Sequence, residues 1–305
     1  MKKIKVLSLY DGKSCGAISL LDLGIEFEYY AIEIDQTARL LSESNINGIK
    51  RVENDVSKVT RDLIKALGPF DIFLAGPPCQ TFSVAGKQQG DFKLLKKTVQ
   101  ILRWCKEFNP EIKYLIENVK MKDKLLKRFE RIVGHKGRLI NSALISYQSR
   151  ERYYFTNLKE ALPCPIEDKS LDCAKFISHG PLSDVKRFKL SDLFKNAKVK
   201  MINMEIGDVF NYSSSGRGKN GVEGRISLAN KALTLTATGY SSRATTAVYM
   251  GNEMYRDLTT REMARLQGIP DAYDYSMISE RQAEKIIGNG WQIDVIKFIL
   301  RELLK

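Results

Sequence analysis

The stretch that decides the fold is Phe70-Asp71-Ile72-Phe73-Leu74-Ala75-Gly76-Pro77-Pro78-Cys79-Gln80-Thr81-Phe82-Ser83. Its first half has the length and apolar content of a short buried strand that ends in a turn. The thiol of Cys79 follows that turn, and α/β folds carry reactive groups at the carboxyl ends of their parallel strands. Because two prolines restrict the backbone before Cys79, its sulfur is held in one direction. We therefore predict a nucleophile rather than a cysteine that only fills core space.

Strand and helix patterns alternate on both sides of this stretch. Strands are predicted at 4–9, 27–34, 51–55, 71–75, 114–117, 138–145 and 152–155, with helices between them at 16–23, 37–44, 61–67, 94–108 and 122–133. This order is typical of an α/β fold with a mostly parallel sheet covered by helices on both faces.

The pattern changes from about residue 160. A serine- and glycine-rich stretch at 213–221 predicts an exposed loop, while 233–237 and 247–250 predict strands. Helical patterns return at 260–266, 280–287 and 291–304. We predict a catalytic and cofactor-binding domain at 1–165, a smaller domain at 166–255, and C-terminal helices at 256–305 that return to the first domain.

Composition limits the possible functions. The 305 residues contain no apolar run long enough for a transmembrane helix, and the N-terminus reads as a first strand rather than a signal peptide. Five widely spaced cysteines and two histidines predict neither a metal site nor a disulfide framework, and they favour a reducing cytoplasm. The net charge of +13 favours a polyanionic partner, although a lysine-rich composition bias would produce the same excess. The basic segment at 120–128 favours a solvated face over a DNA contact.

Three successive strand ends carry residues suited to an adenosine cofactor. The first strand is followed by a loop in which Gly12 and Gly16 allow a tight turn and close approach of a ligand. Glu33, at the end of the second strand, is placed to bind ribose hydroxyls, and Asp55, after the third, is placed to accept from an adenine amino group. On these residues alone, NAD and S-adenosylmethionine both fit.

The stretch from Gly76 to Ser83 resembles the catalytic loop of the cytosine-5 DNA methyltransferases, and further blocks of that family follow in order. Glu117-Asn118-Val119 resembles a second signature, and Gln148-x-Arg150-x-Arg152 a third. The segments 233–240, 256–270 and 288–290 resemble the end of the target-recognition domain and the last two blocks. Only about 160–220 has no counterpart, as expected of a variable recognition region.

The resemblance implies a Rossmann-like methyltransferase sheet with a smaller target-recognition domain, and S-adenosylmethionine as the cofactor. It implies roles for the following residues. The catalytic set is Cys79, Glu117, Arg150 and Arg152. The cofactor set is Tyr10, Asp11, Gly12, Ser14, Cys15, Gly16, Glu33, Ile34, Asp55, Val56, Pro78, Asn289, Gly290 and Trp291. The DNA-binding set is Gln80, Ser83, Gln148, Arg225 and Thr236, with Arg225 reading guanine or contacting a phosphate. No metal is implied.

The implied reaction is methylation of cytosine C5 in a specific short double-stranded DNA sequence. The Cys79 thiolate attacks C6 of a flipped-out base, while Glu117 at N3 and Arg152 at O2 stabilise developing charge. The implied enzyme is a monomer of bacterial or phage origin, associated with the nucleoid, with or without a linked restriction endonuclease.

Three positions depart from the family pattern. Tyr10 stands where Phe is usual, Ile34 where an aromatic residue often stacks on adenine, and Gly290-Trp291 replaces the usual last pair. A Trp at that point resembles the animal de novo methyltransferases.

Three alternative functions remain at this stage. One is the tRNA-acting branch of the superfamily, whose Cys-Phe-Thr tripeptide is absent from this chain. Another is a catalytically silent DNA-binding homologue, and a dinucleotide oxidoreductase is a more distant one.

Overall fold

The structure is a computed structural model of the 305-residue chain. It describes residues 3–78, 92–158, 160–177, 186–193, 197–199, 201–218, 221–237 and 244–305. The chain forms two compact units: unit 1 comprises 1–141, 151–165 and 290–305, and unit 2 comprises 142–150 and 166–289. The domains predicted by role, at 1–165, 166–255 and 256–305, stay predictions.

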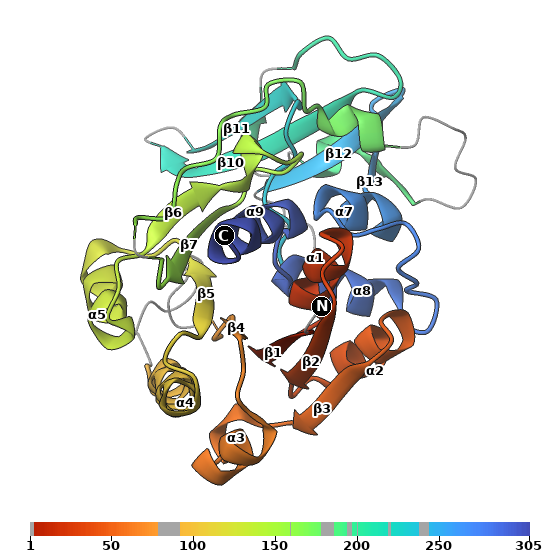
Figure 1. The fold of residues 1–305 in the computed structure, drawn as a ribbon. Helices are drawn as coiled ribbons and strands as arrows, with labels where there is room; N and C mark the ends of the chain where they lie inside the picture. Colours follow the sequence, from red (N-terminus) through yellow and green to blue (C-terminus); the bar gives the residue numbers. More distant parts are fainter. Residues whose placement is uncertain are drawn as a thin grey trace. The chain divides into compact units, whose positions relative to one another are not determined.

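Unit 1 is built on a seven-stranded mixed sheet (Figure 1). The strand order is β3 (Ile49–Glu53), β2 (Phe27–Ile32), β1 (Ile4–Leu9), β4 (Ile72–Ala75), β5 (Lys113–Val119), β7 (Glu151–Thr156) and β6 (Arg138–Asn141). The first five strands run parallel, whereas β7 is antiparallel to both β5 and β6. The α/β sheet predicted from the sequence is therefore confirmed.

Helices cover both faces of this sheet. One face carries α1 (Cys15–Asp22), α2 (Gln36–Asn45) and α9 (Ile293–Leu303), and the other carries α3 (Arg61–Leu67), α4 (Lys93–Phe108) and α5 (Asp123–Val133). A short 3₁₀ turn, η1 (Val56–Lys58), follows β3. All four residues of β4 are buried, so hydrophobic burial on both faces holds the central strand that leads to Pro77 and Pro78.

Unit 2 contains a six-stranded sheet in the order β8 (Arg187–Lys189), β13 (Met254–Asp257), β12 (Ala244–Gly251), β10 (Val209–Gly218), β11 (Gly221–Leu228) and β9 (Ala197–Val199). One face buries a core that includes Phe210, Tyr212, Ile226 and Tyr255. The unit's short helical elements are η2 (Ser142–Leu144), η3 (Cys173–Phe176) and α6 (Leu190–Leu193). Its longer helices are α7 (Thr260–Leu266) and α8 (Glu280–Asn289).

Two sequence predictions in unit 2 are wrong. The stretch 213–221 was expected to be a loop, but β10 and β11 pair across it in an antiparallel ladder. The burial of Phe210 and Tyr212 on one face of β10 outweighs its loop-like composition. Conversely, 233–237 forms no strand. Side chains hold its backbone instead: Thr246 Oγ1 accepts from the Leu233 N–H at 2.8 Å, and Thr234 donates to the Ser149 carbonyl at 2.6 Å.

The described part of the chain contains no helix that is both long and apolar enough to cross a membrane.

Candidate active site

The loop after β1 has the backbone geometry of a ligand cradle. Tyr10, Gly12 and Ser14 have left-handed φ angles of 57°, 55° and 62°. A Cβ added at Gly12 would meet no atom within 4 Å, so the space beside this residue is open. Gly16 serves packing instead, since a Cβ there would lie 2.5 Å from Leu74 Cδ1. The loop therefore exposes backbone at Gly12 and is packed tightly at Gly16.

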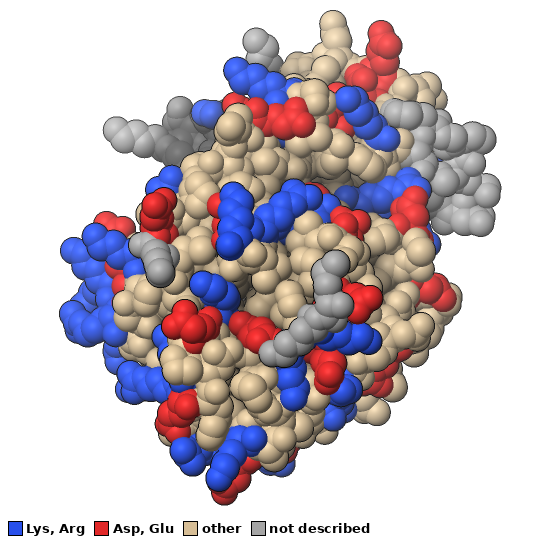
Figure 2. All heavy atoms as spheres, in the orientation of Figure 1, with Lys and Arg blue, Asp and Glu red and all other residues tan. Residues whose placement is uncertain are grey.

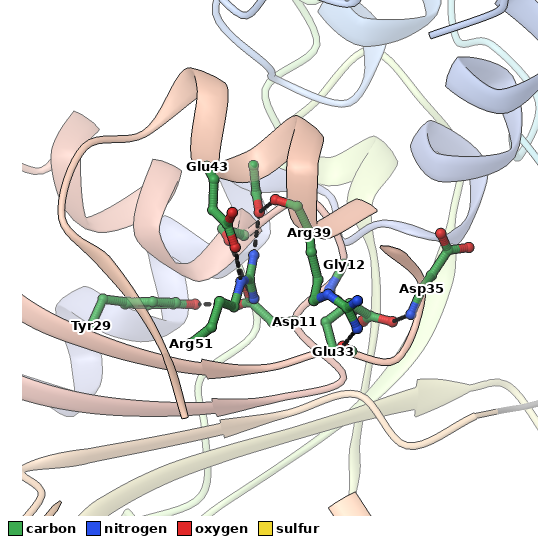
Figure 3. Close-up of polar contacts among 10 residues, drawn as sticks. Asp11, Gly12, Tyr29, Glu33, Asp35, Arg39, Glu43 and Arg51 are labelled. Atoms are coloured by element: carbon green, nitrogen blue, oxygen red, sulfur yellow. Dashed lines mark hydrogen bonds and ion pairs between the residues drawn. The ribbon is translucent and has the colours of Figure 1, made fainter. Parts of the chain in front are cut away.

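A buried polar network holds Asp11 in this loop (Figure 3). The Asp11 carboxylate accepts from the hydroxyl of Tyr29 at 2.8 Å, from Nη1 of Arg51 at 3.1 Å and from the hydroxyl of Ser14. Arg51 also donates from Nε to Glu43 at 3.0 Å. Because Asp11 is buried, each of these donors offsets part of the cost of removing its charge from water.

Glu33 joins the glycine loop to the end of β2. Its Oε2 accepts from the Gly12 N–H at 2.7 Å, and its Oε1 accepts from the Asp35 N–H at 2.8 Å (Figure 3). Burial raises the pKa of the Glu33 carboxyl, and these backbone donors act in the opposite direction. The carboxylate predicted to bind ribose is therefore held beside the open space at Gly12.

Two further predicted cofactor residues present side chains to solvent. Ile34, directly after Glu33, is 70% exposed, which is unusual for a large apolar side chain. Asp55 caps η1, since its Oδ1 accepts from the Ser57 N–H at 2.8 Å, and this bond lowers the pKa of its carboxyl. Val56, the next residue, is buried. Ile34 thus offers an apolar surface and Asp55 a carboxylate at neighbouring strand ends.

The closing segment packs against the glycine loop and the end of β4. A Cβ at Gly76 would lie 2.9 Å from Nε1 of Trp291, so the indole ring rests directly on Gly76. The Cys15 thiol donates to the Trp291 carbonyl at 3.6 Å. A Cβ at Gly290 would overlap Nζ of the buried Lys13. Gly290 therefore fits here because it has no side chain.

The end of β5 carries the predicted catalytic carboxylate. Glu117 Oε1 lies 3.0 Å from Nε of Arg152, and both side chains are mostly buried. Asn118, the next residue, donates from Nδ2 to the Pro77 carbonyl at 3.0 Å. Since β4 and β5 pair in register up to Ala75 and Ile116, both strand ends lie at the same sheet edge. The nucleophile itself, Cys79, lies outside the described residues, as do Gln80 and Ser83; Pro78 is described and exposed.

Arg150 is placed differently from Arg152. Within unit 2 its guanidinium is buried and donates to the carbonyl oxygens of Leu235 at 2.9 Å and Gly288 at 3.0 Å. Gly288 packs tightly there, because a Cβ would lie 2.4 Å from the Thr236 carbonyl oxygen. Arg150 thus joins the segment before Thr236 to the end of α8. These contacts suit a residue that positions the Thr236 segment.

The remaining predicted DNA-binding residues differ in exposure. Gln148 is fully buried, and its side-chain amide finds no hydrogen-bond partner among the described residues. Arg225 and Thr236 are exposed. Arg225 lies opposite Ser213 on β10 and lines a hollow of about 490 Å³ in unit 2. Asn289, at the end of α8, is also exposed.

The sequence prediction missed two positioning residues. Asn118 lies inside the recognised Glu-Asn-Val signature, so the signal was present, but only Glu117 received a role. Arg51 gave no signal, because its partner Asp11 lies 40 residues away in the chain. In the described part of the chain, no group of three or more His, Cys, Asp or Glu could hold a metal ion.

Comparison with known families settles the membership of this chain. The family model of the C-5 cytosine-specific DNA methylases matches residues 4–305. The chain belongs to this family of DNA cytosine-5 methyltransferases. The resemblance predicted from the sequence blocks is therefore confirmed, and with it the class of enzyme. Members of the family use S-adenosylmethionine as methyl donor.

Similar proteins come from bacteria and phages. The chain is 28% identical to the Type II methyltransferase M.HhaI of Haemophilus parahaemolyticus, in a match that covers 97% of this chain and 93% of the relative. It is 27% identical to M.FnuDI of Fusobacterium nucleatum, over 98% of this chain and 94% of that protein. An orphan methyltransferase of Bacillus phage SPR, M.SPRI, is 30% identical over 68% of this chain and 46% of the phage protein.

Solved structures confirm the predicted methyltransferase fold. The Entamoeba histolytica methyltransferase EhMeth matches with a TM-score of 0.73 at 14% identity, covering 100% of this chain and 98% of the other. The S. pombe Dnmt2 methyltransferase matches with a TM-score of 0.71 at 17% identity, covering 99% and 98%.

The residues of the loop fit the family's methyl donor. The open space at Gly12 allows a ligand to approach the backbone, as a cradle for the donor requires. Glu33 supplies a fixed carboxylate for hydroxyl groups, and the exposed side chain of Ile34 supplies an apolar face for a purine ring.

Proposed function

We propose that this protein transfers a methyl group from S-adenosylmethionine to C5 of a cytosine flipped out of a specific short sequence in double-stranded DNA. The observation that carries the proposal is the pair Glu117–Arg152 at the end of β5. The pair shares its sheet edge with the strand end that leads to Cys79, and Asn118 binds Pro77 at that end. A buried carboxylate and a guanidinium beside a predicted thiol nucleophile suit covalent activation of a pyrimidine.

Cys79 begins the proposed chemistry. Its thiolate attacks C6 of cytosine, which breaks the C5–C6 double bond and gives C5 the character of an enamine carbon. Glu117 holds a proton at ring N3, and Arg152 donates to O2, so the developing charge is stabilised where it forms. After C5 has gained the methyl group, a base removes the C5 proton, the double bond forms again and the thiolate leaves.

The glycine loop and its neighbours would hold the methyl donor. When bound, S-adenosylmethionine supplies an electrophilic methyl group on sulfur. Glu33 would bind the ribose hydroxyls, and Asp55 would accept from the adenine amino group. Ile34 and Val56 would hold the adenine ring, and the backbone at Gly12 would face the rest of the donor. Trp291 packs against Gly76, the residue that begins the segment leading to Cys79. The closing segment would therefore border both the donor site and the segment that carries the nucleophile.

Unit 2 would recognise the target sequence. The exposed Arg225 lies on the polar face of β11, where a guanidinium can meet a guanine edge or a phosphate, and Thr236 contacts the DNA backbone. Arg150 orients the segment of Thr236 through the Leu235 carbonyl. The protein acts as a monomer in a bacterial or phage-infected cell, either with a cognate endonuclease or as an orphan enzyme.

Base-resolution mapping of 5-methylcytosine tests the proposal. We would express the wild-type chain and Cys79→Ser in a bacterium that lacks this modification. We expect methylation at one short motif in the wild type and none in the variant. Soluble wild-type protein that binds S-adenosylmethionine but leaves the genome unmethylated would overturn the DNA assignment, and methylated tRNA in the same cells would point to an RNA substrate.

Covalent trapping separates an enzyme from a silent homologue. DNA containing 5-fluorocytosine cannot lose a C5 proton, so the adduct with Cys79 should persist and shift the protein in a denaturing gel. Cys79→Ser is the matched control and should show no shift. If the wild type binds the donor and DNA but forms no adduct, the covalent mechanism is wrong.

A further inference from the structure

Helix α4 carries a stripe of polar and basic side chains that the proposed reaction does not use. Lys93, Lys96, Gln100 and Arg103 follow one another at spacings of three and four residues, so they share one face of the helix. All four are exposed. At 1.5 Å per residue the stripe extends roughly 15 Å along the helix axis. It is thus a linear array rather than a single cationic point.

The stripe forms one side of a hollow in unit 1. This hollow has a volume of about 710 Å³, and its lining includes η1 and α5 as well as α4. Arg128 of α5 and Lys97 of α4 bring the number of basic lining residues to five, and no acidic side chain lines the hollow in the described part of the chain. Figure 2 shows Lys and Arg gathered on the side of the molecule where Figure 1 places α5. We call the side chains of Lys93, Lys96, Gln100, Arg103 and Arg128 the α4 basic surface.

Two of the cations around the hollow are held in place by aromatic rings. The Arg128 guanidinium lies 4.4 Å from the ring centroid of Phe92. Lys97 lies 4.9 Å from the ring of Trp104 and donates to the Val59 carbonyl at 2.8 Å. Cation–π contacts of this kind reduce the freedom of long side chains, so less entropy is lost when a ligand binds.

Some other exposed cations of unit 1 have acidic partners. Arg61 pairs with Glu107 at 2.6 Å, and Lys50 pairs with Glu28 at 2.9 Å. Among the described residues, neither Lys96 nor Arg103 nor Arg128 forms an ion pair. The positive charges of Lys96, Arg103 and Arg128 are therefore left for an anion from outside the described part of the chain.

The methyl donor is not that anion. S-adenosylmethionine carries a sulfonium and an ammonium group against one carboxylate, so a hollow with five basic residues repels it. A small single anion would not need an array roughly 15 Å long. A membrane surface fits poorly, because Phe92 is buried and the hollow presents no exposed aromatic side chain for insertion. Successive phosphates of a nucleic acid strand match both the length and the charge.

We propose that the α4 basic surface binds backbone phosphates of duplex DNA outside the recognised sequence. The position of α4 supports this: the Tyr10 hydroxyl donates to the Leu94 carbonyl at 3.3 Å, so the first turn of α4 lies at the sheet edge where β1 and β4 end and the segment toward Cys79 begins. Such contacts strengthen binding to any sequence and leave base choice to other residues. The inference rests on the proposed function for the identity of the nucleic acid.

The salt dependence of DNA binding tests this surface. The variant Lys93→Gln/Lys96→Gln/Arg103→Gln removes three exposed charges from it. The control Lys65→Gln/Arg301→Gln/Lys305→Gln removes the same number of exposed charges elsewhere in unit 1. Binding of a 30-base-pair mixed-sequence duplex is measured between 50 and 300 mM salt. The slope of log K against log salt should decrease by about 2 to 3 in the surface variant, because each phosphate contact contributes about 0.9.

The controls and rival outcomes are distinct. The control variant should keep the wild-type slope. In case the triple variant folds poorly, the single variants Lys96→Gln and Arg103→Gln are also measured, and each should decrease the slope by about 0.9. An unchanged slope in the surface variants overturns the proposal. Tighter binding of single-stranded or structured RNA than of the duplex, with the same slope change, overturns the choice of DNA.

This assay does not depend on catalysis. The slope can be measured in Cys79→Ser, so failure of the proposed reaction leaves the result for the surface intact. If wild-type protein does methylate DNA, the surface variant should keep kcat at saturating DNA and raise KM for DNA. A fall in kcat with unchanged KM would contradict a role in binding flanking phosphates.

Discussion

The side-chain amide of Asn118 donates to the carbonyl oxygen of Pro77 at 3.0 Å, across 41 residues of chain. Asn118 is buried at the end of β5, and Pro77 lies two residues before Cys79, next to Pro78, the last described residue of this segment. The bond therefore fixes the start of the segment that carries the predicted nucleophile. Because Asn118 also accepts from the Val119 N–H at 3.0 Å, its amide orientation is set from both sides.

We predict that Asn118→Ala lowers kcat by roughly 5- to 150-fold, as expected for about 1–3 kcal/mol of lost positioning by a buried hydrogen bond. Binding of S-adenosylhomocysteine should change little, since no predicted donor contact is removed. Steady-state kinetics and calorimetric titration measure the two quantities.

Asn109→Ala is the matched control for that variant. Asn109 donates from Nδ2 to the Phe70 carbonyl at 2.8 Å, near the other end of β4. The Asn109→Ala variant should lose about as much free energy of unfolding as Asn118→Ala, but its kcat should not fall. Equal losses of kcat in both variants would mean that Asn118 only stabilises the fold.

Arg152→Ala should lower kcat/KM by roughly 10²- to 10³-fold, the usual effect of removing one donor that stabilises developing charge. The change also leaves the buried Glu117 carboxylate without its ion pair. Lys120→Ala is the control, because Lys120 pairs with Glu151 at 2.9 Å between the same two chain segments, but at the exposed surface. That pair should matter little for activity. Wild-type kcat/KM in Arg152→Ala would remove Arg152 from the catalytic set.

Local patterns were sufficient to predict most of unit 1. The bounds of β1 (Ile4–Leu9) and α3 (Arg61–Leu67) match the prediction, because short apolar runs and helical spacing are properties of consecutive residues. The hairpin of β10 and β11 was missed, since its serines and glycines favour a loop until Phe210 and Tyr212 find a core.

Contacts between distant residues could not be predicted in the same way. Arg150 binds carbonyl oxygens 85 and 138 residues away, and no local signal marks a guanidinium for that role. The sequence prediction placed Arg150 and Arg152 together in the catalytic set. The structure pairs Arg152 with Glu117, whereas Arg150 donates to backbone carbonyls of unit 2. The two arginines therefore make different contacts, although only one residue separates them in the sequence.

Ile34→Trp should tighten cofactor binding. Ile34 is 70% exposed beside Glu33, so a larger ring fits without disturbing a core. An aromatic face stacks on adenine better than an aliphatic side chain by about 0.5–1.5 kcal/mol, which corresponds to roughly 2- to 10-fold in Kd. Calorimetric titration with S-adenosylhomocysteine gives the value. Ile34→Ser is the control and should weaken binding, while unchanged affinity in both variants would place the adenine ring elsewhere.

The pH dependence of stability should reveal Asp257 at the end of β13. Burial, with a smaller contribution from Glu284, raises the pKa of the Asp257 carboxyl from 3.8 to about 6. The folded state therefore holds a proton that the unfolded state releases, so stability is lost as the pH rises from about 4 to 6.

Asp257→Asn removes this loss and should raise the free energy of unfolding at pH 7.5 by about 1–2 kcal/mol, allowing for partial exposure, but not at pH 4. Asp271→Asn is the control of opposite sign, because Arg265 lowers the pKa of the Asp271 carboxyl, so its loss should destabilise the protein at pH 7.5 and to a smaller extent at pH 4. Thermal unfolding at both pH values measures the effect, and an equal gain for Asp257→Asn at pH 4 and pH 7.5 would show that the carboxyl is not protonated in the folded state.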